Sequence, residues 1–335
     1  MKIIFKTLLG VAAAALVHSC ATAPSQTLSG LSPEKFVSEV NGKPTALYTL
    51  VNANGMEVCV TNFGGRIVSV MVPDRNGEMK DVVLGFDNIA NYADKVNTPS
   101  DFGASVGRYA NRINKGQIVI DGETIQLPQN NFGHCLHGGP DGWQYQVYDA
   151  VQPDNSTIVL TMESPDGDAN FPGAVTAVVT MKVTDDNAID ISYEAVTDKK
   201  TVINMTNHTY FNLSGDPTRR VDDHLMQIDA DNFTPVDFTF MTTGEILPVE
   251  GTPMDFRQPA AIGQDIKNFE FQQVKFGNGF DHNWCLNTAG DDTKVAARAW
   301  CPETGICLEV LTDEPGVQFY SGNFFDGTYN GKYGK

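Results

Sequence analysis

The stretch AVTAVVTMKVT at residues 174–184 alternates apolar with polar side chains, and the period of the alternation is two residues. The segment AIDISYEAVT at residues 188–197 repeats the pattern, with Ile189, Ile191 and Tyr193 on one side. A period of two is typical of antiparallel strands that turn one face to the core and the other to solvent. Both segments are therefore predicted to be half-buried strands.

Turn signals that favour a sharp chain reversal separate further strand-like runs. They are Asn54-Gly55, Asn76-Gly77, Asp121-Gly122 and the turn from Pro302 to Gly305. Helical patterns are short, because residues 88–94 and 262–269 each allow only a turn or two. We find no internal repeat, low-complexity tract or inter-domain linker. The sequence thus predicts an all-β fold, with one large antiparallel β-sandwich domain over residues 44–335.

The composition and charge of the chain exclude some classes of binding partner and substrate. The chain has 41% hydrophobic and 10% aromatic residues, which suffices for a substantial core. Its net charge is −18 and its pI is about 4.6. Nucleic-acid binding draws most of its affinity from Lys and Arg, so we exclude a nucleic-acid partner. The same acidic excess disfavours an anionic substrate such as a sugar phosphate and favours solubility.

The first twenty residues have the pattern of a targeting segment. Lys2 and Lys6 form a basic start, residues 8–17 are apolar, and the sequence VHSC at residues 17–20 ends the segment. The apolar run is too short to remain in a bilayer as a spanning helix.

We predict a bacterial lipoprotein signal peptide at residues 1–20, in which Cys20 is acylated. Residues 21–43 then form a tether and lead-in to the domain. The alternative is an ordinary secretory signal that contains a cysteine. With the anchor, we expect a protein of the cell envelope that is held to the membrane by lipid alone and faces the periplasm.

Five cysteines follow Cys20 in the sequence: Cys59, Cys135, Cys285, Cys301 and Cys307. An odd number cannot all pair within one chain. A bridge from Cys301 to Cys307 would flank a four-residue turn, but such a turn puts Cys301 opposite Ile306. We therefore expect small core residues, and none has the spacing of a zinc site.

One acidic stretch resembles the start of a calcium-binding loop. Asp166, Asp168 and Asn170 space oxygen ligands as such a loop begins, but Phe171 stands where the loop needs glycine. We predict a hairpin turn here, with calcium as the alternative, and otherwise no metal or cofactor.

Five stretches place polar hydrogen-bonding side chains beside glycines or aromatic residues. They are GRYANRI at 107–113, LHGG at 136–139, NHTYFNLSG at 207–215, GFDHNW at 279–284 and PGVQFY at 315–320. Such groups in convergent directions are suited to a small ligand rich in hydroxyls. The residues that flank His208 are β-branched, aromatic or small, so we place His208 at the end of a strand.

In this order and spacing, the five stretches resemble the aldose 1-epimerase (galactose mutarotase) family, from about Pro44 to Lys335. The resemblance implies the family's supersandwich, two large antiparallel sheets that hold the sugar on a concave face. It also implies an enzyme that interconverts the α and β anomers of free hexoses such as galactose and glucose. We expect the protein to be a monomer. That reaction opens the sugar ring with a positioned acid and base and needs no cofactor.

The resemblance implies a role for each matching residue. His208 matches the proton donor to the ring oxygen, and His137 matches a second histidine near that oxygen. The remaining matches bind sugar hydroxyls or line the pocket: Asn111, Arg112, Tyr210, Asp281 and Gln318. From the residues alone, a structural ion pair is favoured for Arg112, a turn cap for Asp281 and an edge hydrogen bond for Gln318. We expect structural or surface roles for the other histidines, His134, His224 and His282.

The family carries its catalytic glutamate in a segment that follows the stretch resembling residues 324–328, whereas this sequence ends at Lys335. We do not assign Glu309 to that role, because it lies in an earlier strand-like run. Without that base we expect activity lower by about 10²–10⁴-fold. The alternatives are a carbohydrate-binding lipoprotein without turnover, and a hexose-6-phosphate epimerase, which would need a basic cluster that the sequence lacks.

Overall fold

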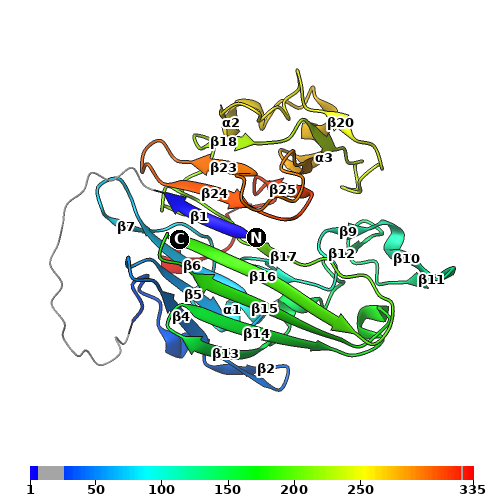
Figure 1. Cartoon of the computed structure of the whole chain (residues 1–335), viewed down its shortest axis with the longest axis horizontal. Coiled ribbons are helices and arrows are strands. Elements are labelled where there is room, and N and C mark those ends of the chain that lie inside the picture. Colours follow the sequence, from blue (N-terminus) through cyan, green and yellow to red (C-terminus); the bar gives the residue numbers. More distant parts are fainter. Residues whose placement is uncertain (7–25, 326) are drawn as a thin grey trace.

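The computed structural model describes residues 1–6, 26–325 and 327–335, so Cys20 lies outside the described residues. Its largest element is a nine-stranded antiparallel sheet (Figure 1). The order is β13 (Asp149–Asp154), β14 (Thr157–Ser164), β15 (Val175–Val183), β16 (Ala188–Thr197), β1 (Lys2–Lys6), β24 (Cys307–Leu311), β23 (Ala297–Trp300), β18 (Leu225–Ile228) and β21 (Ala260–Ala261). The predicted strands at 174–184 and 188–197 are β15 and β16.

Two four-stranded sheets form the opposing layer. One has the order β4 (Leu47–Val51), β5 (Glu57–Thr61), β6 (Arg66–Pro73) and β7 (Met79–Asp81), and the other β20 (Leu247–Pro248), β19 (Asn232–Thr234), β22 (Asp281–Cys285) and β25 (Gly316–Tyr320). The remaining strands form two-stranded ribbons: β2 (Ser38–Val40) with β3 (Lys43–Thr45), β8 (Ala104–Val106) with β17 (Thr206–His208), β9 (Arg112–Ile113) with β12 (Cys135–Leu136), and β10 (Gln117–Ile120) with β11 (Glu123–Gln126). The predicted all-β antiparallel sandwich is confirmed.

Helices are short and lie between strands. They are α1 (Ile89–Ala93), α2 (Ile262–Asp265) and α3 (Gln272–Gly277). The first two fall within the short helical patterns of the sequence, and the side chain of Asn88 caps α1 by accepting the N–H of Asn91. Helix α3 was not predicted. Among the described residues, no helix has both the length and the apolar character that crossing a bilayer requires.

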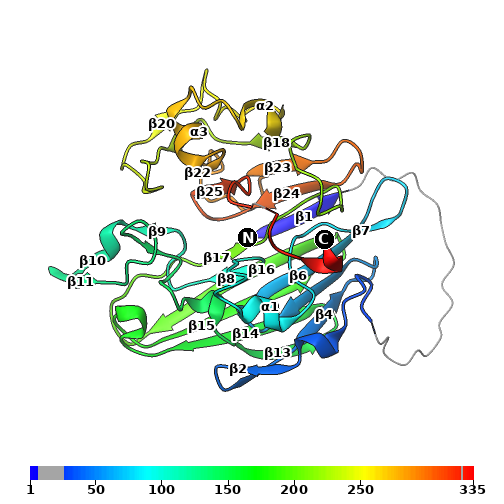
Figure 2. The same cartoon turned by 180° about the vertical axis from the view of Figure 1, so that it is seen from behind.

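The main core lies between the nine-stranded sheet and the sheet β4–β7. Leu160, Val179 and Met181 from the large sheet meet Val60 and Val70 from the smaller one, and all five are fully buried. Figures 1 and 2, from opposite sides, both show β4–β6 layered on β13–β16. A second core lies between β18 and β23 on one side and β19, β22 and β25 on the other. Burial of alternate side chains along β15 is the arrangement that the sequence period predicts.

Strand β1 differs from the sequence prediction, which places residues 1–20 in a leader outside the fold. Lys2–Lys6 pair with both β16 and β24, and the side chains of Ile3 and Phe5 are 3% and 4% exposed. Ile3 and Phe5 point to the core, while Lys2 and Lys6 lie on the opposite face, so the residues of a basic leader also fit an amphipathic strand. The two arrangements exclude each other, since a chain cleaved before Cys20 would lack β1.

The lead-in to the domain also packs more closely than the predicted tether. The backbone N–H groups of Leu28 and Ser29 donate to the carboxylate of Glu57 over 2.9 and 3.2 Å. Leu31 and Phe36 are buried against the outer face of the sheet β4–β7. Residues from about Thr27 therefore belong to the folded domain, because their apolar side chains complete a core.

The turns predicted from the sequence occur in the structure, and most of the cysteines are buried as predicted. Asp121 and Gly122 both have positive φ angles, as a two-residue hairpin turn between β10 and β11 requires. Cys301 donates its N–H to the carbonyl of Ile306 over 3.1 Å, so the turn does oppose those two residues. The five cysteines after Cys20 are free thiols, and three of them are fully buried.

The acidic stretch at residues 166–170 forms the connection between β14 and β15. Asp166 accepts the N–H of Gly173 over 2.6 Å and pairs with Lys199. Asp168 accepts the hydroxyl of Ser164 over 2.5 Å. Protein donors thus engage both carboxylates, as expected for the predicted hairpin turn.

Candidate active site

Two short ribbons bring His208 and His137 together. His208 ends β17, as predicted, and Gly103 beside its partner β8 donates an N–H to the carbonyl of His208 over 3.0 Å. His137 directly follows β12. The two imidazole rings stand nearly perpendicular, at 86°, with centroids 5.2 Å apart. Side chains from segments 71 residues apart in the sequence, 208 minus 137, therefore share one site.

Two glycines allow this close approach. Gly103 has a φ of +66°, and a Cβ there would lie 1.9 Å from the carbonyl oxygen of Ile67. Gly138, in the LHGG stretch, has a φ of +78°, and a Cβ there would lie 2.2 Å from the carbonyl oxygen of Gly107. Only glycine fits at either position, so both histidine strands can pack tightly against the body of the domain.

His137 and Asn111 hold each other in place. The N–H of Asn111 donates to Nδ1 of His137 over 3.0 Å, and the N–H of His137 donates to the carbonyl of Asn111 over 3.0 Å. Both residues have left-handed backbones, with φ of +62° and +50°, a conformation that is retained only where the surroundings stabilise it. Burial lowers the pKa of His137 to about 4, so the ring is neutral at pH 7. Because Nδ1 accepts a hydrogen bond, the neutral ring carries its proton on Nε2 and is a donor there.

Arg112 lies beside the histidines in a fixed orientation. Its Nε and Nη2 donate to Oδ1 of Asn131 over 3.2 and 3.0 Å, and Nη1 lies 3.4 Å from Oδ1 of Asn111. The guanidinium carbon stands 5.0 Å from the centroid of the Phe240 ring. Burial lowers the pKa of Arg112, but an arginine retains its charge at neutral pH. In the described part of the chain it forms no ion pair, so a structural ion pair does not account for it.

Asp281 and Gln318 face the site from the sheet β20-β19-β22-β25. Asp281 begins β22, and its Oδ1 accepts Nε2 of Gln318, from β25, over 2.8 Å. Burial raises the pKa of Asp281, while the hydrogen bond from Gln318 and the charge of Arg112 oppose the rise. The carboxylate therefore binds a side chain across two strands and does not cap a turn.

Tyr210 forms part of an aromatic wall behind His208. Its ring stacks on His208 with centroids 5.0 Å apart, and it packs edge-on against Phe102 and Tyr320. Burial raises the pKa of the Tyr210 phenol well above its usual value, so the group stays protonated. The wall excludes water from one side of the imidazole and fixes the plane of the ring.

One further carboxylate of the site was not predicted. An oxygen of Asp101 and one ring nitrogen each of His137 and His208 all lie within 4.8 Å of one another. Oδ1 of Asp101 is buried and accepts no hydrogen bond from the described residues. Asp101 belongs to none of the five polar stretches, and no sequence signal pointed to it, because its place beside the histidines depends on the pairing of Ala104 with His208.

Comparison with known proteins now places the chain in a family. A family model described as aldose 1-epimerase matches residues 46–335. The chain belongs to the aldose 1-epimerase family. It is 39% identical to the galactose mutarotase of Sus scrofa over 284 residues, which cover 85% of this chain and 80% of that protein. It is 38% identical to the aldose 1-epimerase of Escherichia coli K12 over 289 residues, or 86% and 82% of the two chains.

Solved structures of the aldose 1-epimerase family have the same fold. An aldose epimerase homologue from C. elegans superposes with a TM-score of 0.79 at 30% identity, covering 87% of this chain and 85% of its own. A galactose 1-epimerase from Lactobacillus acidophilus superposes with a TM-score of 0.76 at 31% identity, covering 86% and 82%. The family's isomerase class and its β-sandwich therefore apply to this chain.

Within this member of the aldose 1-epimerase family, Glu309 lies away from the histidines. It sits in β24, where Arg298 and Lys6 pair with its carboxylate over 2.7 and 2.6 Å. Its side chain is buried in the nine-stranded sheet, and these ion pairs lower its pKa against the effect of burial. Glu309 is thus held by ion pairs within the large sheet, as expected for an ordinary strand residue.

The three other histidines hold backbone groups in place. Nδ1 of His134 accepts the N–H of Lys115, Nε2 of His224 accepts the N–H of Leu213, and Nδ1 of His282 accepts the N–H of Asp281. All three are buried. These are the structural placements expected from the sequence.

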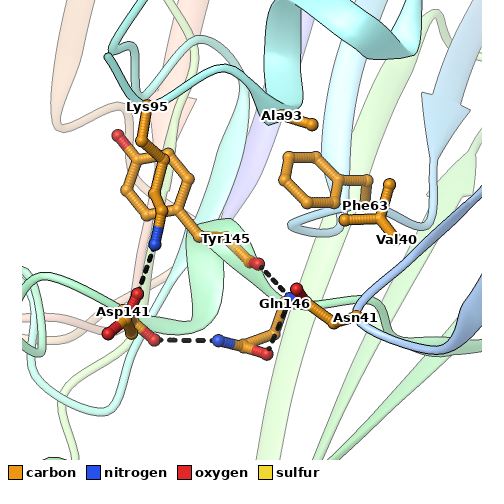
Figure 3. Close-up of a pocket in the computed structure, with 8 residues that line it drawn as sticks. All are labelled: Val40, Asn41, Phe63, Ala93, Lys95, Asp141, Tyr145 and Gln146. Carbon is orange, nitrogen blue, oxygen red and sulfur yellow. Dashed lines mark hydrogen bonds and ion pairs between the residues drawn. The ribbon is translucent and has the colours of Figure 1, made fainter.

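A cavity of about 270 Å³ lies outside the predicted site (Figure 3). Its lining consists of Val40, Asn41, Phe63, Ala93, Lys95, Asp141, Tyr145 and Gln146. Lys95 pairs with Asp141, and Gln146 donates to the Asp141 carbonyl over 3.0 Å. Because its polar side chains bond to one another and none is a predicted sugar ligand, this cavity is distinct from the site around the histidines.

Proposed function

We propose that this protein interconverts the α and β anomers of free aldoses such as galactose and glucose. The observation that carries the proposal is the contact between His137 and His208, one of which is a fixed neutral donor. The relatives named galactose mutarotase and aldose 1-epimerase support it, and they disfavour the alternative of a binding protein without turnover.

His208 is the proposed acid. When the bond between C1 and the ring oxygen O5 breaks, O5 must gain a proton and the hydroxyl on C1 must lose one. A histidine can give and recover a proton near neutral pH, and the stacked Tyr210 holds the ring of His208 in one orientation. Rotation about C1–C2, followed by closure on the other face of the aldehyde, gives the other anomer.

The surrounding residues are proposed to bind the sugar. His137 donates from Nε2 to an oxygen near C1. Arg112 and Asn111 donate to hydroxyls, while Asp281, supported by Gln318, accepts from hydroxyls farther away. Two carboxylates and one guanidinium suit a neutral polyol better than a phosphorylated sugar, because the local charge repels an anion.

The direct test of this function is polarimetry of freshly dissolved α-galactose and α-glucose. We expect the parent chain to accelerate mutarotation above the spontaneous rate, and dialysis against a chelator to leave that rate unchanged. Asp281→Asn should weaken sugar affinity in titration calorimetry, while the exposed Asp121→Asn should not. A folded protein that bound neither sugar and left the spontaneous rate unchanged would contradict the proposal.

We also propose that Cys20 anchors the protein to the envelope and that the protein acts as a monomer. The sequence of the leader supports the anchor, and acyl labelling of the parent beside Cys20→Ala tests it. Equal labelling of the two chains would contradict the anchor. Light scattering after size-exclusion chromatography would show a monomer mass if the second proposal holds.

A further inference from the structure

We propose that three aromatic rings beside Arg112 form a second sugar subsite, which binds the pyranose joined to the one held by the histidines. The rings belong to Phe132, Phe240 and Phe324, which we term the phenylalanine cluster. The inference rests on the proposed mutarotase function and deepens it by naming a substrate class, the reducing disaccharides and longer oligosaccharides.

The phenylalanine cluster is an exposed group of rings from three distant segments. The centroid of the Phe240 ring lies 5.6 Å from that of Phe132 and 5.5 Å from that of Phe324. Phe132 and Phe324 are 63% and 58% exposed, whereas Phe240, in contact with both, is 9% exposed. None of the three belongs to the hydrophobic cores that the described residues form. Core packing therefore does not account for these rings, and a contiguous exposed apolar surface marks a binding site.

Two turns hold Phe132 and Phe240 at a fixed spacing. Phe132 has a φ of +47° and Phe240 a φ of +64°, a conformation that bulky residues rarely adopt and that persists only where the surroundings enforce it. Asn131 and His134 exchange backbone hydrogen bonds of 3.2 and 2.8 Å around Phe132. Nε2 of His134 lies 2.8 Å from the hydroxyl of Thr239, which directly precedes Phe240. The two turns are thus bonded to each other, and the rings are positioned before any ligand binds.

Arg112 connects the phenylalanine cluster with the proposed sugar site. Its guanidinium carbon lies 5.0 Å from the centroid of the Phe240 ring, and its Nη1 lies 3.4 Å from Oδ1 of Asn111. Asn131, which accepts two hydrogen bonds from Arg112, directly precedes Phe132. A sugar whose hydroxyls are bound by Arg112 therefore lies next to the cluster.

Tyr320 provides a second connection, on the side of Phe324. Tyr320 lies opposite Asp281 in the ladder between β22 and β25. Its hydroxyl accepts the N–H of Phe324 over 3.1 Å, and the two rings stack at 25° with centroids 6.4 Å apart. The cluster thus adjoins both Arg112 and Asp281, the two charged side chains that are proposed to bind sugar hydroxyls.

The chemistry of mutarotation decides how a longer sugar would lie. The reaction requires a free hydroxyl on C1, so a second residue can be joined only through another hydroxyl of the reacting sugar. Arg112 and Asp281 are proposed to hold such hydroxyls, and the cluster lies beside them. The C–H groups on one face of a pyranose form an apolar surface, which packs against the electron-rich face of an aromatic ring. We therefore expect the reducing end at His208 and the second ring on the phenylalanine cluster.

The test is titration calorimetry of the full chain with glucose and with cellobiose, maltose and lactose, whose reducing residue is glucose. Each aromatic contact contributes about 2- to 10-fold in affinity. At least one of the three disaccharides should therefore bind about 5- to 50-fold more tightly than glucose. The KM for its mutarotation, measured by polarimetry, should be lower than that for glucose by a similar factor, because the second ring is distant from the bond that breaks. Equal affinities for glucose and all three disaccharides would overturn the inference.

Variants of the exposed rings show where the second residue binds. Phe132→Ala should remove most of the disaccharide gain and leave glucose affinity within about twofold, whereas Phe132→Tyr retains a ring and should retain the gain. Phe238→Ala is the matched control, because Phe238 is 73% exposed but packs on no other aromatic ring of the described residues. Circular dichroism establishes that each variant is folded. A folded Phe132→Ala with the full gain, or equal losses in Phe132→Ala and Phe238→Ala, would overturn the inference.

Failure of the subsite and failure of the proposed activity are distinguishable. If the parent interconverted the anomers of glucose but bound no disaccharide more tightly, the inference would fail and the mutarotase function would stand. If the parent bound no sugar and left spontaneous mutarotation unchanged, both would fail. If Phe132→Ala abolished a disaccharide gain but no sugar was turned over, the subsite would stand and the proposed activity would fail.

Discussion

The long strands β14–β16 and the short ribbons around the histidines are built on different principles. β14 and β15 contain eight and nine residues, and alternate side chains along them are fully buried. β17 and β12 contain three and two residues, and the side chains of His208 and His137 are only half-buried. Packing fixes the first region, whereas hydrogen bonds and left-handed residues fix the second.

The stability of the fold and the chemistry of the site thus depend on separate parts of the molecule. Burial of apolar side chains contributes about 1.5–3 kcal/mol for each large residue, and the nine-stranded sheet supplies many of them. The ribbons bury small side chains such as those of Ala104 and Val106, and they hold His137, His208 and Arg112 at fixed positions. Substitutions in the sheet should therefore lower the free energy of unfolding, and substitutions in the ribbons should lower binding or rate.

The largest effect on stability is expected for Phe5→Ala in β1. Phe5 is 4% exposed in the main core, and removal of a buried phenylalanine typically costs about 3–5 kcal/mol. Lys2→Ala is the matched control, with a cost below about 1 kcal/mol because, among the described residues, Lys2 pairs only with the exposed Asp186 and Asp190. Urea unfolding of protein made without export measures both. If Phe5→Ala were as stable as the parent, β1 would lie outside the fold and the leader prediction would be supported.

Acid should weaken the folded state through its buried histidines. Burial lowers the pKa of both His282 and His137 to about 4, from an ordinary value of about 6.5. The unfolded chain therefore binds protons first, and stability falls as the pH decreases from 6.5 towards 4. The loss is up to about 3 kcal/mol for the fully buried His282 and smaller for the partly solvated His137.

Thermal unfolding between pH 7 and 4.5 measures this loss. His282→Gln removes the titrating ring, and Gln can still accept the N–H of Asp281. The variant should therefore lose less stability on acidification than the parent. A pH dependence equal to that of the parent would show that His282 is not held neutral by burial.

Strands β15 and β16 of the nine-stranded sheet follow from the sequence alone. The period of two at 174–184 and 188–197 predicts β15 and β16 because burial alternates with side-chain direction. Strand β1 was not predicted, because two lysines that flank three apolar residues fit a basic leader as well as an amphipathic strand, and the leader itself stays a prediction. Helix α3 was missed because Val274 is its one buried large apolar side chain and Phe271, at its start, is not a capping residue.

The candidate site was less accessible to sequence reasoning. Its residues were singled out by resemblance, and the structure shows that they lie together through pairings between distant segments. Asp101 could not be found in this way, since its proximity to the histidines depends on the pairing of β8 with β17. Local patterns carry no information about which distant strands pair, so the composition of a loop-built site stays undetermined until the fold is known.

A smaller effect is expected for a substitution that weakens sugar binding but leaves the proposed acid, His208, in place. Arg112→Lys removes a planar group with two bonds to Asn131, and a lysine cannot reproduce that geometry. Hydrogen bonds to charged groups contribute about 1.5–3 kcal/mol, so galactose affinity should fall about 10- to 100-fold. Arg298→Lys, in the large sheet, is the control and should leave affinity unchanged. Equal affinities in calorimetry would remove Arg112 from the site.

The mutarotation rate of His208→Gln tests the central claim most directly. The account predicts a fall of about 10²–10⁴-fold from the parent rate, at equal concentrations of folded protein and with α-galactose as substrate. The free energy of unfolding should change by less than about 1 kcal/mol, because His208 is half-buried in a short ribbon. A folded His208→Gln that kept the parent rate would contradict the claim that the ribbons carry the chemistry.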